Sequence, residues 1–162
     1  MGMTARTLLV ILGIFFLLIP SVGQEIPEPT VYSDVVFSYS LREFSQILQS
    51  GNDTSLRTDV LYLLGGTVTS ITVLDPNPES YYVDIEILDA RWVTTSQLES
   101  YEAYLVILDH SFAERISSSQ NAPGDLLKPQ IRGLFLLEYY GPTETVTGEL
   151  APVFILRDFT IL

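Results

Sequence analysis

The stretch YYVDIEILDARW places acidic side chains at Asp84, Glu86 and Asp89, with valine and isoleucine between them. Alternate residues of a β-strand share one face about 7 Å apart, a separation that some glycosidase carboxylate pairs use. The same alternation is typical of a strand with one face in the core and the other in water. We therefore interpret Asp84 and Glu86 as a solvated face, with a hydrolase that uses them as the less favoured alternative.

A partial calcium-loop pattern lies just upstream, in DPNPESYYVDIE. Asp75, Asn77, Glu79 and Glu86 occupy its positions 1, 3, 5 and 12, but Ser80 stands at position 6, where the loop needs glycine. Two prolines also restrict the backbone here. We therefore predict no metal site.

Other catalytic patterns are also missing from the sequence. The chain has no cysteine, its single histidine is His110, and it contains no nucleophile-elbow motif. One histidine without cysteine is a poor zinc ligand set. The sequence therefore predicts a protein that is not an enzyme, with no catalytic residue and no cofactor.

The first 23 residues are typical of a signal peptide. Arg6 precedes an apolar run, Leu8 to Ile19, and Pro20 with small residues after it favours cleavage before Gln24. The run holds 12 residues, fewer than the roughly 20 of a membrane-spanning helix, although an uncleaved anchor is the alternative. We expect an exported protein of the bacterial periplasm or cell surface, which also fits the absence of cysteine.

Charge bears directly on the class of partner. Cleavage would leave 20 acidic residues against 7 basic ones (8 less Arg6), a formal net charge of −13. Nucleic acids are bound largely through lysine and arginine, so this charge predicts no nucleic-acid partner.

Residues 24–38 are expected to form an extended arm, followed by a short helix in SLREFSQILQSG. Ser40 and Glu43 fit a capping box, and Gly51 is suited to end the helix. Asn52 begins an N-glycosylation pattern that has meaning only in a eukaryotic secretory pathway.

Five β-strands are predicted from Val60 onward. The glycine pair Gly65–Gly66 suggests a bulge or bend in the first of them. A short helix between the third and fourth strands is predicted from Ser111 and Glu114, a second capping box. The predicted strands are VLYLLGGTVTSITVL, YYVDIEILDARWV, YEAYLVILD, QIRGLFLLEYY and APVFILRDFTIL.

This element order resembles the OB-fold, a small five-stranded Greek-key barrel, and small exported bacterial OB-fold proteins in particular. A β-sandwich, the rival architecture, would have about seven strands. The predicted fold is therefore mainly β, an OB-like barrel with a leading short helix and a helix between strands 3 and 4. Residues 39–162 would form the single domain, with the barrel over 60–162.

The alternation in the second strand shifts phase at Leu88–Asp89, which predicts a bulge that turns Ala90 and Trp92 inward. A lone tryptophan in a small domain is usually buried, which favours a core position for Trp92. Pointing outward, it would instead lie on the face where OB-folds bind ligands.

The OB-fold resemblance implies a ligand face across the second and third strands. The predicted function is a non-catalytic binding module of the cell envelope that recognises a protein or small ligand, possibly a basic one. The alternative is a structural protein that self-associates through sheet edges, because its last strand runs to Leu162 with no charged residue after Asp158. The candidate ligand-binding residues are Tyr82, Arg91, Trp92, Tyr101, Tyr104 and Arg132.

Overall fold

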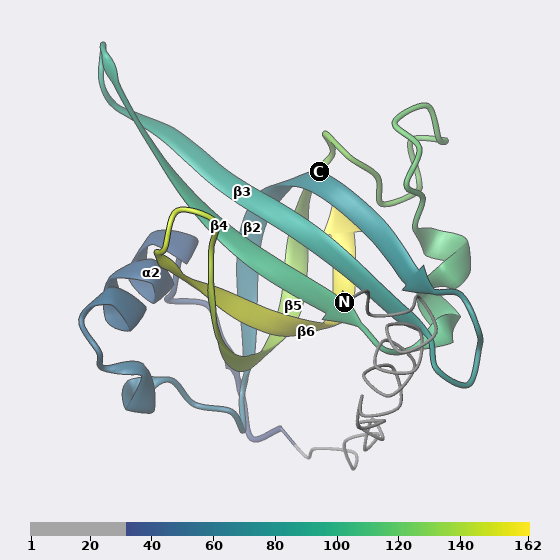
Figure 1. Cartoon of the computed structure of the whole chain (residues 1–162), viewed down its shortest axis with the longest axis horizontal. Coiled ribbons are helices and arrows are strands. Elements are labelled where there is room, and N and C mark those ends of the chain that lie inside the picture. The colour runs from purple at the N-terminus through teal and green to yellow at the C-terminus, as the bar shows by residue number, and fades with distance from the viewer. Residues whose placement is uncertain (1–31) are drawn as a thin grey trace, which may run out of the picture. The chain divides into compact units, whose positions relative to one another are not determined.

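The computed structural model describes residues 32–162, coloured in Figure 1. The predicted signal peptide and the first part of the predicted arm lie outside these residues. Over residues 32–162, no helix is long and apolar enough to cross a membrane. Strand β1, Val35–Val36, pairs in parallel with Leu61 and Tyr62 and was not predicted.

The five predicted strands are present and form an OB-like barrel. The order is β1-β2-β3-β4-β6-β5, and a further pairing of β2 with β5 brings the two ends of the sheet together. Strands β4 and β6 pair in parallel, whereas the other barrel pairings are antiparallel. The predicted fold class is therefore confirmed. The bounds are β2 Leu61–Asp75, β3 Tyr82–Thr94, β4 Gln97–Ile107, β5 Arg132–Glu144 and β6 Leu150–Ile161.

Strand β2 pairs with β5 along its first half and with β3 along its second half. The change of partner comes at Thr67, which pairs with both strands. The predicted bulge at Gly65–Gly66 is wrong: the register with β5 is unbroken there, and the shift against β3 comes between Val68 and Ser70. The glycines instead lie where two strands approach closely, since a Cβ on Gly66 would meet β3 at 3.4 Å.

The barrel core follows from the alternation in the strands. Val83, Ile85 and Ile87 of β3 are fully buried, and the residues between them face outward. The predicted solvated face of this strand is thus confirmed for Glu86, which is exposed, whereas Asp84 is half-buried. The same core receives the largest buried rings from other elements, namely Phe44, Tyr62, Phe135 and Phe154.

Helix α2, Leu41–Gln49, packs against β4 and β6. Its predicted capping box is confirmed: the Ser40 side chain accepts from the Glu43 backbone N–H, and the Glu43 carboxylate accepts from the Ser40 N–H at 2.7 Å. The Ser40 hydroxyl also donates to the Glu43 carboxylate at 2.8 Å, and this hydrogen bond, together with the one from the Ser40 N–H, holds the pKa of Glu43 below its usual value. Gly51 follows the helix with a φ of +71°, a conformation that suits glycine.

The predicted second helix is a 3-10 helix, η2, His110–Arg115. It begins two residues earlier than the predicted N-cap at Ser111 implies, because the Asp109 carboxylate accepts from the Ser111 N–H at 2.8 Å. The predicted capping box of Ser111 and Glu114 is therefore wrong, since Asp109 takes the role of N-cap.

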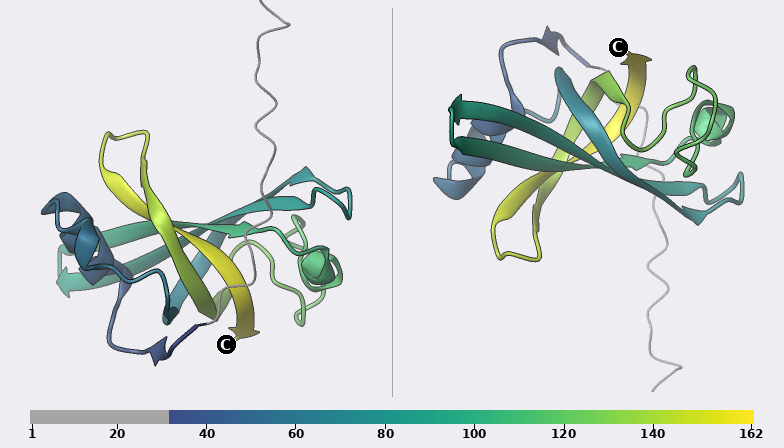
Figure 2. Two further views of the ribbon diagram at one scale, coloured as in Figure 1. Left: turned by 90° about the horizontal axis from the view of Figure 1, so that it is seen from below. Right: turned by 90° about the horizontal axis from the view of Figure 1, so that it is seen from above.

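The β3–β4 hairpin extends past the rest of the sheet, as Figures 1 and 2 show. Pairing of β3 with β2 ends at Leu88, whereas pairing with β4 continues without a shift to Trp92. The predicted bulge at Leu88–Asp89 is therefore wrong. No bulge is needed to keep Asp89 out of the core, because the strand has already left the barrel at this point.

The last strand makes contacts on both of its edges. Arg115 donates to the Phe159 carbonyl at 3.1 Å and pairs with Asp158 at 2.9 Å. On the other side, β5 pairs along β6, and the Leu162 N–H donates to the Arg132 carbonyl. Both edges of this segment therefore have contacts within the domain.

Candidate functional site

Three tyrosines lie on the outer face of the sheet, and we call Tyr82, Tyr104 and Tyr140 the tyrosine face. Tyr82 and Tyr104 are half-buried on β3 and β4, and Tyr140 on β5 is 73% exposed. Burial raises the pKa of Tyr82, Asp84 raises it further, and the phenol of Tyr140 makes a smaller contribution in the same direction. Sequence reasoning missed Tyr140. Neighbouring residues of a strand face opposite sides, so Tyr140 points outward where Tyr139 is buried.

Carboxylates are interleaved with these rings. Asp84 and Glu86 follow Tyr82 on β3, and Glu86 lies directly opposite Tyr104 on β4. Burial raises the pKa of Asp84 above its usual value, and the charge of Glu86 raises it further. Burial also raises the pKa of Tyr104, with Glu102 and Glu86 adding to the effect. The face therefore combines stacking surfaces with negative charge.

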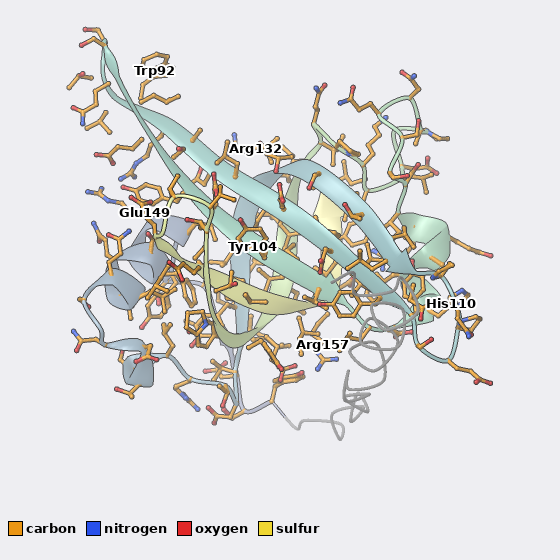
Figure 3. All side chains as sticks on the ribbon, in the orientation of Figure 1. Trp92, Tyr104, His110, Arg132, Glu149 and Arg157 are labelled. Carbon is orange, nitrogen blue, oxygen red and sulfur yellow. The ribbon has the colours of Figure 1, made fainter. Side chains whose placement is uncertain are left out.

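Trp92 lies at the end of the projecting hairpin, away from the barrel, as Figure 3 shows. Its side chain is 68% exposed, beside the exposed Val93 and opposite the exposed Leu98. The favoured core position is therefore wrong. The hairpin carries Trp92 beyond the reach of β2, so no neighbouring strand or helix covers it.

Two other candidate residues lie on the opposite face of the hairpin. The Arg91 guanidinium is 4.0 Å from the Glu99 carboxylate, and the Tyr101 hydroxyl donates to the same carboxylate at 2.9 Å. Tyr101 is half-buried and packs against the core near α2. The structure therefore separates Arg91 and Tyr101 from the tyrosine face.

The last candidate, Arg132, starts β5, where it pairs with Thr67 of β2, and β6 lies between β5 and β4 in the strand order. Within residues 32–162 it makes no ion pair. Arg157, by contrast, pairs with the nearly buried Glu138 of the neighbouring strand, with its Nε 2.9 Å from the carboxylate. The Tyr32 hydroxyl also donates to Glu138.

A groove of about 410 Å³ lies between α2, β4 and the β5–β6 hairpin. It exists because β4 and β6 pair only from Tyr104 and Val153 onward and separate before that point. Pro152, which has no N–H for a ladder, stands at the separation. The lining residues are Ser45, Gln49, Glu99, Ser100, Tyr101, Glu102, Thr145, Thr147, Glu149, Leu150 and Ala151.

The calcium-like stretch is a turn stabilised by its own side chains. The Asp75 carboxylate accepts from the Asn77 N–H at 2.9 Å and from the Ser80 hydroxyl at 2.7 Å. These hydrogen bonds, the backbone one foremost, lower the pKa of Asp75. Over residues 32–162, no three acidic or histidine side chains gather as metal ligands.

Comparison with known proteins gives matches in structure alone. No protein-family model and no curated protein matches the chain. A structure of the Plasmodium falciparum SSB in complex with ssDNA has 12% sequence identity to this chain and a TM-score of 0.43. The match covers 63% of this chain and 93% of the SSB chain. The Saccharomyces cerevisiae mitochondrial single-stranded DNA-binding protein Rim1 has 12% identity and a TM-score of 0.36, and covers 63% and 92%.

These neighbours require a correction of the predicted function. The sequence predicted an envelope module that recognises a protein or small ligand and excluded nucleic acid, whereas both similar structures are single-stranded DNA-binding proteins. The predicted module and its two alternatives are therefore not retained. At 12% identity the likeness concerns the fold, and it assigns no ligand to this chain.

Proposed function

We propose that the barrel binds single-stranded nucleic acid by base stacking and catalyses no reaction. The observation that carries this proposal is the tyrosine face itself. Two of its three rings, Tyr82 and Tyr104, lie on the second and third barrel strands, β3 and β4, across which OB-folds bind oligonucleotides, and Tyr140 lies on β5.

The geometry suits an extended strand of nucleotides. Glu86 and Tyr104 are direct partners across β3 and β4, and Tyr104 pairs in turn with Val153 of β6, so this part of the face is continuous. Stacking of a base on an aromatic ring contributes about 1–3 kcal/mol and tolerates any sequence. Binding over two or three rings would therefore need no basic groove.

Charge determines how such binding responds to salt. Asp84, Glu86 and Glu102 lie among the rings and would repel phosphates. Added salt screens that repulsion, so the affinity should rise with ionic strength. A protein that holds phosphates with lysine and arginine behaves in the opposite way, because it loses affinity as salt increases.

The test is fluorescence anisotropy of a labelled single-stranded oligonucleotide, titrated with the chain at several salt concentrations. Tyr140→Ala should weaken binding roughly tenfold, the loss of one stacked base. Phe37→Ala is the matched control, because Phe37 is 71% exposed but follows β1, which pairs with β2 and with none of the strands that carry the tyrosine face. Absence of binding at every salt concentration would refute the proposal, as would equal effects of the two variants.

A second ligand class, a neutral oligosaccharide, is favoured by the excess of carboxylates over bases around the rings. OB-folds bind oligosaccharides on the same strands. A neutral chain would stack on Tyr104 and Tyr140 without repulsion, so its binding should not depend on salt. Titration of the intrinsic fluorescence with uncharged oligosaccharides tests this, and unchanged fluorescence would exclude it.

We also propose that the chain is a small exported bacterial protein, as its first 23 residues predict. Mass spectrometry of the chain recovered from cell fractions should show an N-terminus at Gln24. An intact Met1 in the cytoplasmic fraction would contradict export.

A further inference from the structure

We propose that the groove between α2, β4 and the β5–β6 hairpin reads the bases of the bound strand. It would prefer bases that carry an exocyclic amino group, such as cytosine, over thymine. This inference rests on the proposed nucleic-acid binding and adds base selectivity to it.

The groove meets the tyrosine face at Glu102, whereas Glu99 and Tyr101, which also line it, lie on the opposite side of β4. Tyr104 and Glu102 are two residues apart on β4 and point to the same side, a spacing of about 7 Å. Glu102 lines the groove together with Glu149 of the β5–β6 hairpin. Figure 3 labels Tyr104 and Glu149 on these two elements. A base next to one stacked on Tyr104 would therefore reach the groove.

The side chains of the groove suit hydrogen-bond donors on a base. An ionised carboxylate only accepts, and glutamate accepts from the amino group of cytosine. Within residues 32–162, the Glu102 and Glu149 carboxylates make neither an ion pair nor a hydrogen bond to another side chain, so both are free to accept. Thymine offers no amino group to either carboxylate.

The groove also contains one nearly buried hydroxyl and some apolar surface. Ser45 lines the groove although it is only 8% exposed, and its Oγ accepts from the Gln49 amide at 3.2 Å. Its own proton donates to no other described side chain. Leu150 and Ala151 add apolar surface against which the flat face of a base can lie. A volume of about 410 Å³ falls within the range of small-ligand pockets.

The test compares oligodeoxycytidine with oligothymidine of equal length, which carry equal charge, in the anisotropy titration. The unaltered chain should prefer oligodeoxycytidine roughly tenfold, as expected of one good base contact. Glu102→Gln and Glu149→Gln keep the size of each side chain and should remove the preference. Asp84→Asn is the matched control, because it removes a charge from the tyrosine face outside the groove and should leave the preference unchanged.

The outcomes separate this inference from the proposed function. Equal binding of the two oligonucleotides by the unaltered chain would overturn the base reading and leave stacking intact. Base reading would also be overturned if the glutamine variants bound both oligonucleotides more tightly by the same factor. That result would show only that the substitutions relieve repulsion of the phosphates. Failure to bind either oligonucleotide would overturn the proposed function itself. Circular dichroism confirms that each variant is folded.

Discussion

Replacement of Phe44 tests whether α2 is an integral part of the barrel. Phe44 is fully buried, and its ring centroid lies 5.0 Å from those of Tyr62 and Phe154, 5.3 Å from that of Tyr39 and 5.9 Å from that of Tyr139. Truncation of a buried phenylalanine to alanine costs about 3–5 kcal/mol, and a site enclosed by four rings belongs near the middle of this range or above it.

We therefore expect Phe44→Ala to lower the free energy of unfolding by about 4 kcal/mol. Unfolding entropy is about 2.1 cal/mol/K per residue, so over the roughly 130 residues of the folded unit the Tm should fall by about 15 °C. Thermal and urea unfolding, followed by circular dichroism, measure the two quantities. Phe44→Leu retains part of the contact and should cost about 1–2 kcal/mol, which keeps the test usable if the alanine variant does not fold.

Gln46→Ala on the exposed side of the same helix is the control and should change stability by less than about 0.5 kcal/mol. A cost below about 1 kcal/mol for Phe44→Ala would contradict the reasoning. It would mean that α2 detaches from the barrel at little expense, so that its packing in the structure contributes little to the cooperative unit.

Three further changes have defined outcomes. Ser40→Ala should lower the Tm and cost about 1 kcal/mol in chemical unfolding, because it removes an N-cap; no loss would show that the cap is dispensable. Asp84→Asn should raise the Tm at neutral pH but not in acid. The pKa of Asp84 is raised in the folded protein, so its carboxyl destabilises the fold once the pH rises through that pKa and the group ionises. An equal shift in Tm at both pH values would argue against charge as the cause. Glu138→Ala should cost about 2–3 kcal/mol in urea unfolding, because it leaves Arg157 without its nearly buried partner, whereas Asp59→Ala at an exposed pair should cost clearly less; equal costs would contradict this ranking.

Local patterns were sufficient for the elements whose geometry depends on near neighbours. The capping box of Ser40 and Glu43 lies within one turn of chain, so the start of α2 follows from the sequence alone. Alternation likewise assigned Val83 and Ile85 to the core face, because the two faces of a strand differ in polarity wherever one of them is buried. The number of barrel strands and their order along the chain followed from the same signal.

Tertiary structure decided where each strand loses its neighbours. The sequence shows that Trp92 belongs to a strand, but its exposure depends on β2 ending its pairing at Leu88, several residues earlier. Likewise, the groove depends on β4 and β6 separating before Tyr104, and these strands are far apart in the chain. Periodicity states which residues share a face, whereas only the packed sheet determines how far that face is covered, because coverage comes from segments that are distant in the sequence.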